Sequence, residues 1–425
     1  MTVSGWTSEL CLKCNVCTAA CPVAAATDQF LGPKAVGPQA ERFRHPRAPV
    51  PDPSVSWCSG CGVCSRVCPH GVPVAELNIL AKARLASQHR YPFRDQLLAR
   101  PSFLAAMARP LAPIANALLG TPAARALAEA AVGISRLAPM PRFASTTFRS
   151  TVPHLHARSP ERRSDRPLVA YFHGCSVDSY EPGLGRLTVQ VLEVLGFDVV
   201  LPPQGCCGLP LQSNGLLEAA RKYARTNLDG LGPFAAANVP IIGTSTSCTL
   251  ALKHEYRAIL GLAGESADQV AADTYDVFEF LLDGDPTPLA RAAFQSLPLR
   301  VLYHPPCQLQ GHWIGWPALE VLRRVPDLEV VLSDSDCCGV AGTYGLKRER
   351  YDVARSVGQG LFDQVQSSRV DVVVTDSETC RWWVAGHAGV RAVHPLEILA
   401  AAMGLPAGGS SLVHNPPRGN EAAIS

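Results

Sequence analysis

The apolar residues of the second half of the chain follow two alternating patterns. From about residue 166 onward, short runs rich in Val, Ile and Leu alternate with stretches in which apolar residues recur every three or four positions. The short runs are typical of buried strands, and the longer stretches are typical of amphipathic helices. Their alternation predicts parallel β–α units with helices packed on the faces of a sheet.

This pattern occurs twice, with its elements in the same order. The expected strands of the first copy are the runs "PLVAYF", "FDVVL" and "VPIIG". Those of the second copy are "RVLY", "LEVVL" and "VDVVV". The helical stretches "LLEAARKYARTNLDGL" and "RYDVARSVGQGLFDQV" follow the second strand of each copy. The repeat predicts two pseudo-symmetric parallel α/β domains, over residues 166–290 and 291–403.

Residues 93–165 have a different pattern, apolar and sparsely charged. "FLAAMARPLAPIANALLG" and "ALAEAAVGISRLAP" are rich in Ala and Leu, and six arginines follow between Arg142 and Arg166. The segment is either a helical linker packed on the core or a patch lying in a bilayer surface, with arginines meeting anionic lipids. Because no uninterrupted run reaches 18 apolar residues, no transmembrane helix is predicted. Residues 404–425 are expected to form a disordered tail.

Composition narrows the class of protein. The chain has 425 residues, of which 47% are hydrophobic and 17% charged, so it can bury a sizeable core. Its net charge of +2 gives no reason to expect a nucleic-acid partner. The start "MTVSGWTSELC" has no apolar signal-peptide core, which favours a cytoplasmic protein with reduced thiols. The 16 cysteines are then better explained as metal ligands than as disulfides.

The first eight cysteines form two copies of C-x2-C-x2-C-x3-C-P. The first copy comprises Cys11, Cys14, Cys17 and Cys21, and the second comprises Cys58, Cys61, Cys64 and Cys68. This is the motif of two-cluster bacterial ferredoxins, in which the fourth cysteine of each copy binds the other cluster. It predicts one [4Fe–4S] cluster on Cys11, Cys14, Cys17 and Cys68, and a second on Cys58, Cys61, Cys64 and Cys21.

Residues 1–92 are therefore expected to form a helical two-cluster ferredoxin-like domain. Two zinc knuckles are the alternative, but zinc needs only paired C-x2-C motifs and leaves the extra cysteines and both following prolines unexplained. The Pro- and Arg-rich stretch between the motifs, from about residue 30 to 56, is expected to be an insertion loop without a helix or strand.

The other eight cysteines each follow an expected strand of the repeat. They form one set of Cys175, Cys206, Cys207 and Cys248, and a second set of Cys307, Cys337, Cys338 and Cys380. Because the carboxyl ends of parallel strands meet at one edge of a sheet, each set is expected to converge into a metal site there. A disulfide between the adjacent cysteines is disfavoured, since adjacent α-carbons lie about 3.8 Å apart and a relaxed disulfide needs about 4.4–6.8 Å.

At these residues the chain resembles the CCG-domain (cysteine-rich) iron–sulfur proteins. The resemblance rests on "CCGVAGTYGLKRERY", "TDSETCRWW", "TSTSCTLALKHEY" and "GPKAVGP", and extends over residues 5–400. It implies an electron-transfer subunit that passes electrons from a flavin-containing dehydrogenase subunit to the membrane quinone pool. It also implies a peripheral position on the inner face of the cytoplasmic membrane. The expected upstream substrate is glycerol-3-phosphate, with glycolate or lactate oxidation as the alternative.

One departure from the family pattern affects both CCG sites. The full pattern ends in C-x-x-C and gives five cysteines per copy, but Ser245 and Ser377 stand at the first of those two positions. Four cysteines can hold a cube, a modified cluster completed by serine or water, or a tetrahedral zinc ion. The expectation is one further iron–sulfur cluster in each CCG site, with zinc as the alternative in one of them.

Other sequence features bear on the chemistry. His173, His304 and His312 lie near the first cysteine of a copy and are either structural or candidate ligands and proton donors. No G-x-G-x-x-G follows a strand and no P-loop is present, so a flavin is expected on another chain. A heterodisulfide-reductase-like thiol–disulfide enzyme and a zinc-stabilised scaffold with a ferredoxin-like head are the competing functions.

Overall fold

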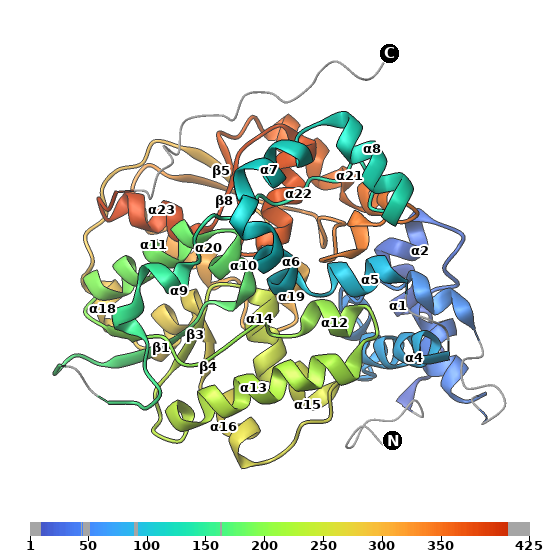
Figure 1. Cartoon of the computed structure of the whole chain (residues 1–425), viewed down its shortest axis with the longest axis horizontal. Coiled ribbons are helices and arrows are strands. Elements are labelled where there is room, and N and C mark those ends of the chain that lie inside the picture. The colour runs from blue at the N-terminus through green and yellow to red at the C-terminus, as the bar shows by residue number, and fades with distance from the viewer. Residues whose placement is uncertain (1–9, 44, 46–51, 89–91, 162–163, 407–425) are drawn as a thin grey trace.

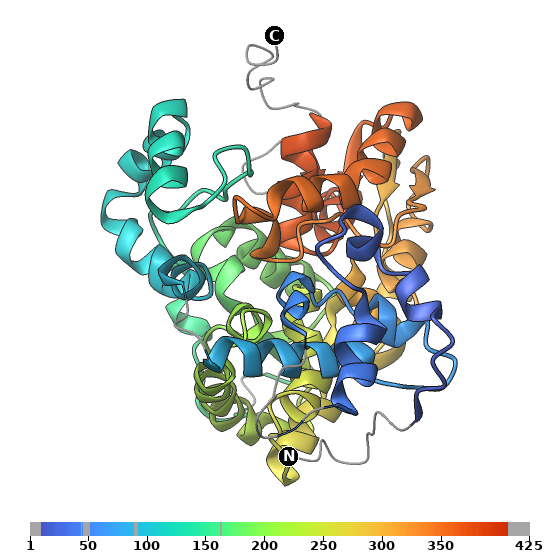
Figure 2. The ribbon, with the colours of Figure 1, turned by 90° about the vertical axis from the view of Figure 1, so that its right-hand side faces the viewer.

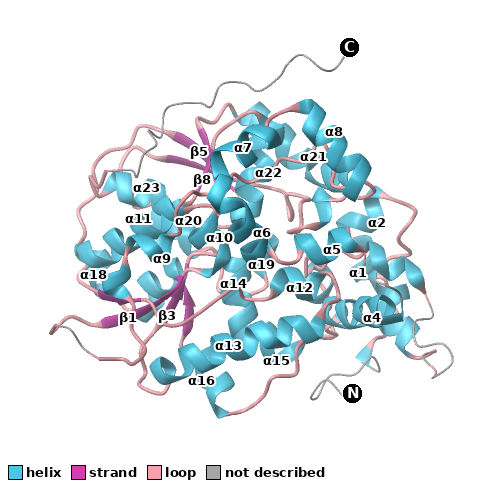
Figure 3. Cartoon of the chain, in the orientation of Figure 1, coloured by secondary structure: helices cyan, strands magenta, loops and turns pink. Residues whose placement is uncertain are grey.

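The computed structural model describes residues 10–43, 45, 52–88, 92–161 and 164–406 of the chain (Figure 1). Two parallel four-stranded sheets, magenta in Figure 3, organise the part after residue 166. The first sheet contains β1 (Leu168–Phe172), β2 (Asp198–Val200), β3 (Ile241–Gly243) and β4 (Thr274–Asp276), in the order β2-β1-β3-β4. The second contains β5 (Arg300–Tyr303), β6 (Glu329–Leu332), β7 (Val372–Val374) and β8 (Ala392–Val393), in the order β6-β5-β7-β8. The shared topology confirms the predicted tandem parallel α/β repeats.

The fourth strand of each sheet is absent from the sequence prediction. Strand β4 consists of Thr, Tyr and Asp, which is not an apolar run, and β8 has only two residues. Both lie at a sheet edge, where they pair in parallel with β3 and β7 respectively. Their strand conformation therefore depends on a partner that only the folded sheet provides.

Helices cover the faces of both sheets, and the first and last cysteines of each set lie in helices, whereas the paired cysteines lie in loops. In the first repeat the helices are α10 (Gly174–Ser179), α11 (Pro182–Val194), α12 (Leu209–Ser213), α13 (Leu217–Ala235), α14 (Thr246–Leu250), η6 (Ala251–Glu255), α15 (Tyr256–Ala258), α16 (Glu265–Ala272), α17 (Val277–Glu279), η7 (Phe280–Gly284) and α18 (Thr287–Arg291). In the second repeat they are α19 (Cys307–Gln310), α20 (Pro317–Leu322), η8 (Tyr344–Leu346), α21 (Tyr351–Ser368), α22 (Glu378–Ala388) and α23 (Pro395–Ala402).

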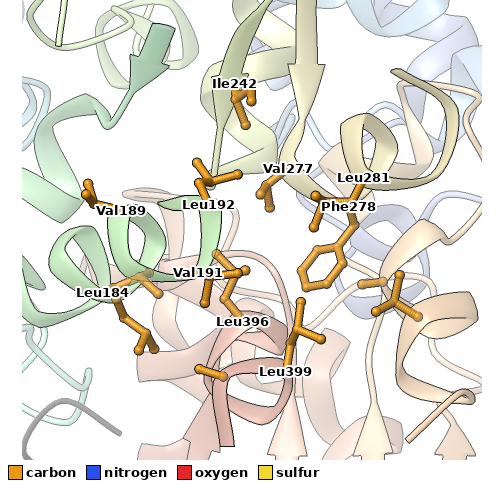
Figure 4. Close-up of a cluster of buried hydrophobic side chains, with 14 of the residues drawn as sticks. Leu184, Val189, Val191, Leu192, Ile242, Val277, Phe278, Leu281, Leu396 and Leu399 are labelled. Carbon is orange, nitrogen blue, oxygen red and sulfur yellow. The ribbon is translucent and has the colours of Figure 1, made fainter. Parts of the chain in front are cut away.

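The two repeats share one hydrophobic core. Helix α11 of the first repeat packs on α23 of the second, and α17 packs on α20. Figure 4 shows this junction, where Val191 and Leu192 of α11 lie near Leu396 and Leu399 of α23. All four side chains are fully buried. The repeats therefore fold against each other, and the carboxyl ends of their strands are held in a fixed relative position.

The amino-terminal part packs against both repeats. It contains α1 (Val16–Ala19), α2 (Pro22–Ala26), η2 (Ala35–Gln39), η3 (Pro53–Trp57), α3 (Val63–Arg66) and α4 (Val74–Gln88), drawn in blue in Figures 1 and 2. Helix α2 contacts α21 of the second repeat, and α4 contacts α12 of the first. This contact places the ferredoxin-like motifs beside the CCG repeats.

The expectation of an insertion loop without helices between the two ferredoxin motifs is wrong. The π-helical turn η2 and the 3₁₀-helix η3 lie in this stretch. Val36 and Gly37 of η2 are buried against α4, and a β-carbon on Gly37 would lie 2.2 Å from Oδ1 of Asn78. The turn is helical because α4 buries its apolar face, which the Pro-rich composition does not reveal. Residues 44 and 46–51 of this stretch lie outside the described residues.

The connecting segment forms an arm of short helices, teal in Figure 2. Its elements are α5 (Phe93–Leu98), α6 (Pro101–Ala108), η4 (Arg109–Leu111), α7 (Ala112–Leu119), α8 (Pro122–Val132), α9 (Phe148–Thr151) and η5 (Pro153–Leu155). Eight of the 16 exposed large hydrophobic side chains in the described residues belong to it. They are Phe93, Phe103, Met107, Leu111, Ile114, Leu118, Leu127 and Leu137.

The helical stretch Pro101–Leu119 of the arm is long and apolar enough to cross a membrane by length and composition, and its most apolar window is only 11% buried. A search for uninterrupted apolar runs misses it, because Arg109 and Asn116 interrupt the run. The stretch is also bent by the 3₁₀ turn η4, which contains Pro110. An exposed apolar surface of this kind marks a site for contact with a partner or a membrane.

Candidate metal centres

The first predicted ligand set lies together around one small pocket. Cys11, Cys14, Cys17 and Cys68 all line it. Cys14 is exposed, whereas Cys17 is buried, so this pocket lies close to the molecular surface. The backbone N–H of Val72 donates to Sγ of Cys68 at 3.4 Å, the kind of hydrogen bond that stabilises a thiolate.

The second predicted ligand set lines a separate and deeper pocket. Cys58, Cys61 and Cys64 meet Cys21 there, and all four cysteines are buried. The structure thus brings each of the two predicted sets into a pocket of its own. The fourth cysteine of each motif lies in the pocket of the other motif.

Matching backbone turns give the two motifs the same loop shape. Residues Lys13 and Gly60, between the first and second cysteines, have φ values of 64° and 74°. Asn15 and Gly62, between the second and third, have φ values of 70° and 82°. These left-handed turns fold three successive sulfurs around one centre, and at the first motif two non-glycine residues adopt them.

The second ligand set adjoins the second CCG site. Cys61 packs in one buried cluster with Cys307 and Cys337 of that site. Arg66, on helix α3 that also contains Cys64, donates to the carbonyl of Cys307 at 3.3 Å and to Oε1 of Gln310 at 2.7 Å. This contact joins the ferredoxin-like domain to the first loop of the second repeat and makes the two metal sites neighbours.

The first CCG site gathers its four cysteines at the carboxyl ends of β1, β2 and β3. Sγ of Cys175 lies 3.6 Å from Sγ of Cys206, and all four cysteines are buried. Asn227 of α13 holds the paired-cysteine loop, because its amide oxygen accepts from Gly205 N–H at 2.8 Å and its amide nitrogen donates to the carbonyl of Cys206 at 3.0 Å. The hydroxyl of Tyr256 donates to the carbonyl of Cys207 at 2.9 Å.

The second CCG site has the corresponding arrangement in the second sheet. Sγ of Cys338 lies 3.1 Å from Sγ of Cys380, and Gly339 N–H donates to Sγ of Cys337 at 3.3 Å. Gly339 has a φ of 94°, and a β-carbon there would lie 1.9 Å from the carbonyl oxygen of Ala354. Only glycine fits, and this explains the residue that follows the paired cysteines.

The buried thiols fit a metal centre better than an inert core. Burial raises the pKa of Cys21 to about 11, and burial together with nearby Cys337 raises the pKa of Cys61 to about 12. These two thiols remain protonated and unreactive at neutral pH unless a cation replaces the protons. The clustering of four sulfurs in each site is the donor set that iron–sulfur clusters and zinc require.

The two serines that depart from the family pattern have hydrogen-bond partners. Ser245 donates to Oε2 of Glu378 at 3.0 Å, and Ser176 donates to Oε1 of the same carboxylate at 2.7 Å. Ser377 lies 3.2 Å from the hydroxyl of Thr379. Glu378 belongs to the second repeat and both of its serine partners to the first, so the hydroxyl of Ser245 is directed to a contact between the repeats.

Both CCG sites open into one central cavity of about 170 Å³. Seven cysteines line it: Cys61, Cys175, Cys207, Cys248, Cys307, Cys338 and Cys380. Its wall also includes Tyr180 and Trp382, and Leu98, Pro101 and Leu104 of the arm. Because the strand ends of the two sheets face each other, the sites share a space that the sequence repeat alone does not indicate.

Glu255 is a titratable residue of the cavity wall that sequence reasoning does not identify. Glu255 follows Cys248 by two helical turns, and its side chain accepts from Nε2 of Gln212 at 3.0 Å. Burial raises the pKa of Glu255 to about 8, so the carboxyl group is largely protonated at neutral pH. The sequence carries no signal for it, because a single Glu on a helix is usually a solvated residue.

The three candidate histidines have different surroundings. His173 packs edge-on against Phe148 and Tyr171. Its Nδ1 lies 2.7 Å from the carbonyl oxygen of Gly174, and its Nε2 is buried without a hydrogen-bond partner. Nε2 of His312 lies 3.0 Å from the carbonyl of Thr246, and burial lowers the pKa of this histidine to about 3. His304, in contrast, lies beside Cys338 and Cys380.

A ferredoxin-like pair of four-cysteine pockets, joined to two parallel α/β repeats with paired cysteines, defines an iron–sulfur protein of the CCG class. Residues 7–72 match the model of the 4Fe-4S dicluster domain, and residues 169–253 and 301–385 each match that of the Cysteine-rich domain. These matches confirm the resemblance found in the sequence.

The chain belongs to a family that includes a subunit of anaerobic glycerol-3-phosphate dehydrogenase. It is 35% identical to that subunit from Escherichia coli K12 over 400 residues, which cover 93% of this chain and 98% of the relative. It is also 26% identical to the glycolate oxidase iron-sulfur subunit from Escherichia coli K12, over 92% of this chain and 93% of the relative. One subunit of the fumarate reductase (CoM/CoB) of Methanothermobacter marburgensis is 25% identical, over 92% of this chain and 71% of that protein.

Proposed function

We propose that this chain is the electron-transfer subunit that links a flavin-dependent dehydrogenase to the membrane quinone pool, with glycerol-3-phosphate as the oxidised substrate. The observation that carries the proposal is the order of the four cysteine sets, from the surface at Cys14 to the central cavity. The 35% identity to one subunit of a glycerol-3-phosphate dehydrogenase supports the choice of substrate.

The ligand sets define the cofactors in this proposal. Two [4Fe–4S] clusters bind the amino-terminal sets, and one further iron–sulfur cluster binds each CCG site, with zinc as the alternative in one of these sites. Iron–sulfur clusters supply one-electron transfer when bound. The chain's own contribution is to place the sets next to one another, most directly where Cys61 meets Cys307 and Cys337.

The entry point for electrons is the exposed first set. Leu10, Leu12 and Val16 surround it with exposed apolar side chains, at 47%, 68% and 42% of their full exposure. An apolar rim around a shallow metal pocket suits the docking of a flavin-containing dehydrogenase subunit. The flavin belongs to that partner.

The exit point is the central cavity, which suits a quinone. Leu98, Leu104 and Trp382 give its wall an apolar character, and Glu255 supplies a buried carboxyl group. Reduction of a quinone to a quinol consumes two electrons and two protons, so a proton donor is needed close to the metal sites. A carboxyl group with a pKa of about 8 carries its proton at neutral pH and can release it there.

The apolar arm is the proposed contact with the membrane. Its exposed side chains, among them Met107, Leu111 and Ile114, lie next to residues of the same arm that line the cavity. An arm lying in the inner surface of the cytoplasmic membrane would bring lipid-soluble quinone to the cavity mouth. Of the arginines expected to meet lipids, Arg142 and Arg158 are exposed, whereas Arg149 donates to the carbonyl of Pro202 at 2.9 Å.

Reconstitution with purified components tests the proposal. The chain is purified anaerobically with its dehydrogenase partner, and glycerol-3-phosphate-dependent quinone reduction is measured on anionic lipid vesicles. The variant Leu111→Ser/Ile114→Ser is expected to lower vesicle binding and quinone reduction at least tenfold while a soluble electron acceptor is still reduced. Val194→Ser, at a side chain exposed to 60% outside the arm, is the matched control and should behave as the wild type.

The outcomes separate the parts of the proposal. No quinone reduction with the intact partner refutes the relay to quinone, and unchanged vesicle binding in the arm variant refutes the membrane contact. Because the relatives include the iron-sulfur subunit of a glycolate oxidase, glycolate and lactate are tested as donors in the same assay. Reduction driven by either one, and not by glycerol-3-phosphate, reassigns the substrate.

A further inference from the structure

His304 is a buried side chain at the end of β5 that the fold alone does not explain. The residue is fully buried, and its Nε2 has no hydrogen-bond partner in the structure. A buried polar atom without a partner is unfavourable, so such an atom usually faces a group absent from the protein chain. What it faces here is the second CCG site.

The ring of His304 is oriented toward two cysteines. Nε2 or Nδ1 of His304 and the sulfurs of Cys338 and Cys380 all lie within 4.8 Å of one another. Nδ1 lies 3.1 Å from Oγ of Ser333, so Nε2 is the ring atom left for the metal site. The backbone N–H of Ser335 donates to the same Ser333 oxygen at 3.1 Å, which fixes that hydroxyl in place.

This arrangement matches that of a metal-binding histidine. In such residues one ring nitrogen binds the metal and the other donates its N–H to a protein oxygen, which sets the tautomer and the ring orientation. Ser333 can accept from Nδ1–H with a second lone pair, and this leaves the lone pair of Nε2 directed at the site.

The first repeat has no histidine at the position equivalent to His304. Tyr171 and Tyr303 occupy matching positions, since their hydroxyls bond to Thr244 and Asp376 after the third strand at 2.9 and 2.8 Å. The next residue is Phe172 in the first repeat and His304 in the second, and each lies three positions before the first cysteine of its site. Phenylalanine has no ligand atom, so the imidazole distinguishes the second site from the first.

We propose that Nε2 of His304 is a metal ligand of the second CCG site and supplies the fifth ligand group that Ser377 does not. The inference rests on the proposed function only in that the second CCG site binds a metal centre. It makes the two CCG sites unlike, with four thiolates in the first and four thiolates with one imidazole in the second.

The test is the nitrogen coupling of the metal centre in the intact chain. Protein labelled with ¹⁵N-histidine is purified anaerobically and poised at the potentials where its clusters are paramagnetic, and pulsed electron paramagnetic resonance records the nitrogen hyperfine coupling. We expect a strong hyperfine coupling to a histidine nitrogen, and this coupling should change when ¹⁵N replaces ¹⁴N. His304→Phe, which installs the residue of the first repeat, should abolish it. His173→Phe, at a buried histidine that packs against Phe148 and Tyr171, should retain it.

If metal analysis finds zinc in the second site, zinc-edge X-ray absorption replaces the resonance measurement. The expected result is then scattering from an imidazole that takes one of the four zinc positions, and His304→Phe should remove it. If the variant fails to fold, the coupling in the labelled wild-type protein is still a test of ligation.

Two outcomes overturn ligation by His304. One is a weak nitrogen coupling, which shows a hydrogen bond to sulfur, and the other is the same spectrum in His304→Phe and in the wild type. If Cys338→Ala/Cys380→Ala leaves the iron and zinc content unchanged, the site binds no metal and both proposals fail. Lost quinone reduction with an intact coupling refutes only the proposed function.

Discussion

At the scale of single residues, the positions of the paired cysteines depend on glycines, because glycine lets two backbone segments pack closely against each other. The paired cysteines of the second site follow β6, and the next residue, Gly339, sits against helix α21. Gly358 of helix α21 packs against the loop in turn, since a β-carbon at this residue would lie 2.3 Å from the carbonyl oxygen of Cys338. The position of two sulfurs is therefore set by a glycine on each side of the contact.

The variant Gly358→Ala is expected to displace the Cys338 loop. The added methyl group meets backbone and cannot be accommodated by a side-chain rotation, so we expect a loss of about 1–3 kcal/mol in the free energy of unfolding. Iron content should fall by the amount of one metal site. Denaturant unfolding and elemental analysis measure the two effects.

Gly360→Ala on the same helix is the matched control. Gly360 is exposed, and a β-carbon there would have only Oγ of Ser335 within 4 Å, at 3.7 Å. Replacing a helical glycine by alanine stabilises a helix by about 0.5–1 kcal/mol, so this variant should be slightly more stable with full metal content. Equal behaviour of the two variants would contradict the role given to Gly358.

At the scale of elements, each ligand loop is held by the helix that follows it. Asn227 lies in the middle of α13, and its amide bonds to the loop on both sides of the junction between Gly205 and Cys206. The same amide nitrogen lies 2.9 Å from the hydroxyl of Tyr256, which in turn holds the carbonyl of Cys207. One side chain thus couples the helix, the loop and a second helix.

Asn227→Ala should loosen the first CCG site. The substitution leaves the partly buried N–H of Gly205 and the buried carbonyl of Cys206 without partners, and a buried group without a partner costs about 1–3 kcal/mol. We expect a drop of at least about 2 kcal/mol in unfolding free energy and a loss of metal from the first site with the second retained. The exposed neighbour Thr226→Ala should change stability by less than about 0.5 kcal/mol. Full metal retention in Asn227→Ala would show that the loop holds its shape without α13.

At the scale of the whole molecule, the two repeats are joined by a shared core and by a buried ion pair. Arg381 of α22 bonds to Glu181, which precedes α11 in the first repeat, and Nε1 of Trp382 donates to the same carboxylate at 2.8 Å. The side chains of Arg381 and Glu181 are exposed to only 5% and 21%. Removing one partner of such a pair leaves a buried charge uncompensated.

Glu181→Ala is therefore expected to lower the unfolding free energy by about 3–5 kcal/mol. Asp268→Asn breaks the pair of Arg257 and Asp268, whose side chains are exposed to 62% and 50%, and should cost less than about 1 kcal/mol. Chemical denaturation of the metal-loaded proteins gives both values. Similar small losses in the two variants would mean that the repeats are held by the hydrophobic core alone.

Much of the fold follows from local patterns, and its exceptions have physical causes. The period of the apolar residues predicts the strands β1–β3 and β5–β7 and the long helices α13 and α21, because packing on a sheet requires that period. It does not predict β4, β8 or the helical turn η2, since none of them is an apolar run and each takes its conformation from a neighbour. The four cysteine sets follow from spacing and repeat, and the structure brings each set together.

The sequence by itself therefore determined the class of protein, the two repeats and the grouping of 16 cysteines into four sets, because metal ligands must recur at short and fixed spacings. The tertiary structure decided the rest. It placed Cys61 beside the second CCG site, turned both CCG sites toward one cavity with Glu255 in its wall, and aimed His304 at Cys338 and Cys380. These contacts join residues far apart in the chain, and only the packing of the two sheets and the ferredoxin-like domain against one another brings them within reach.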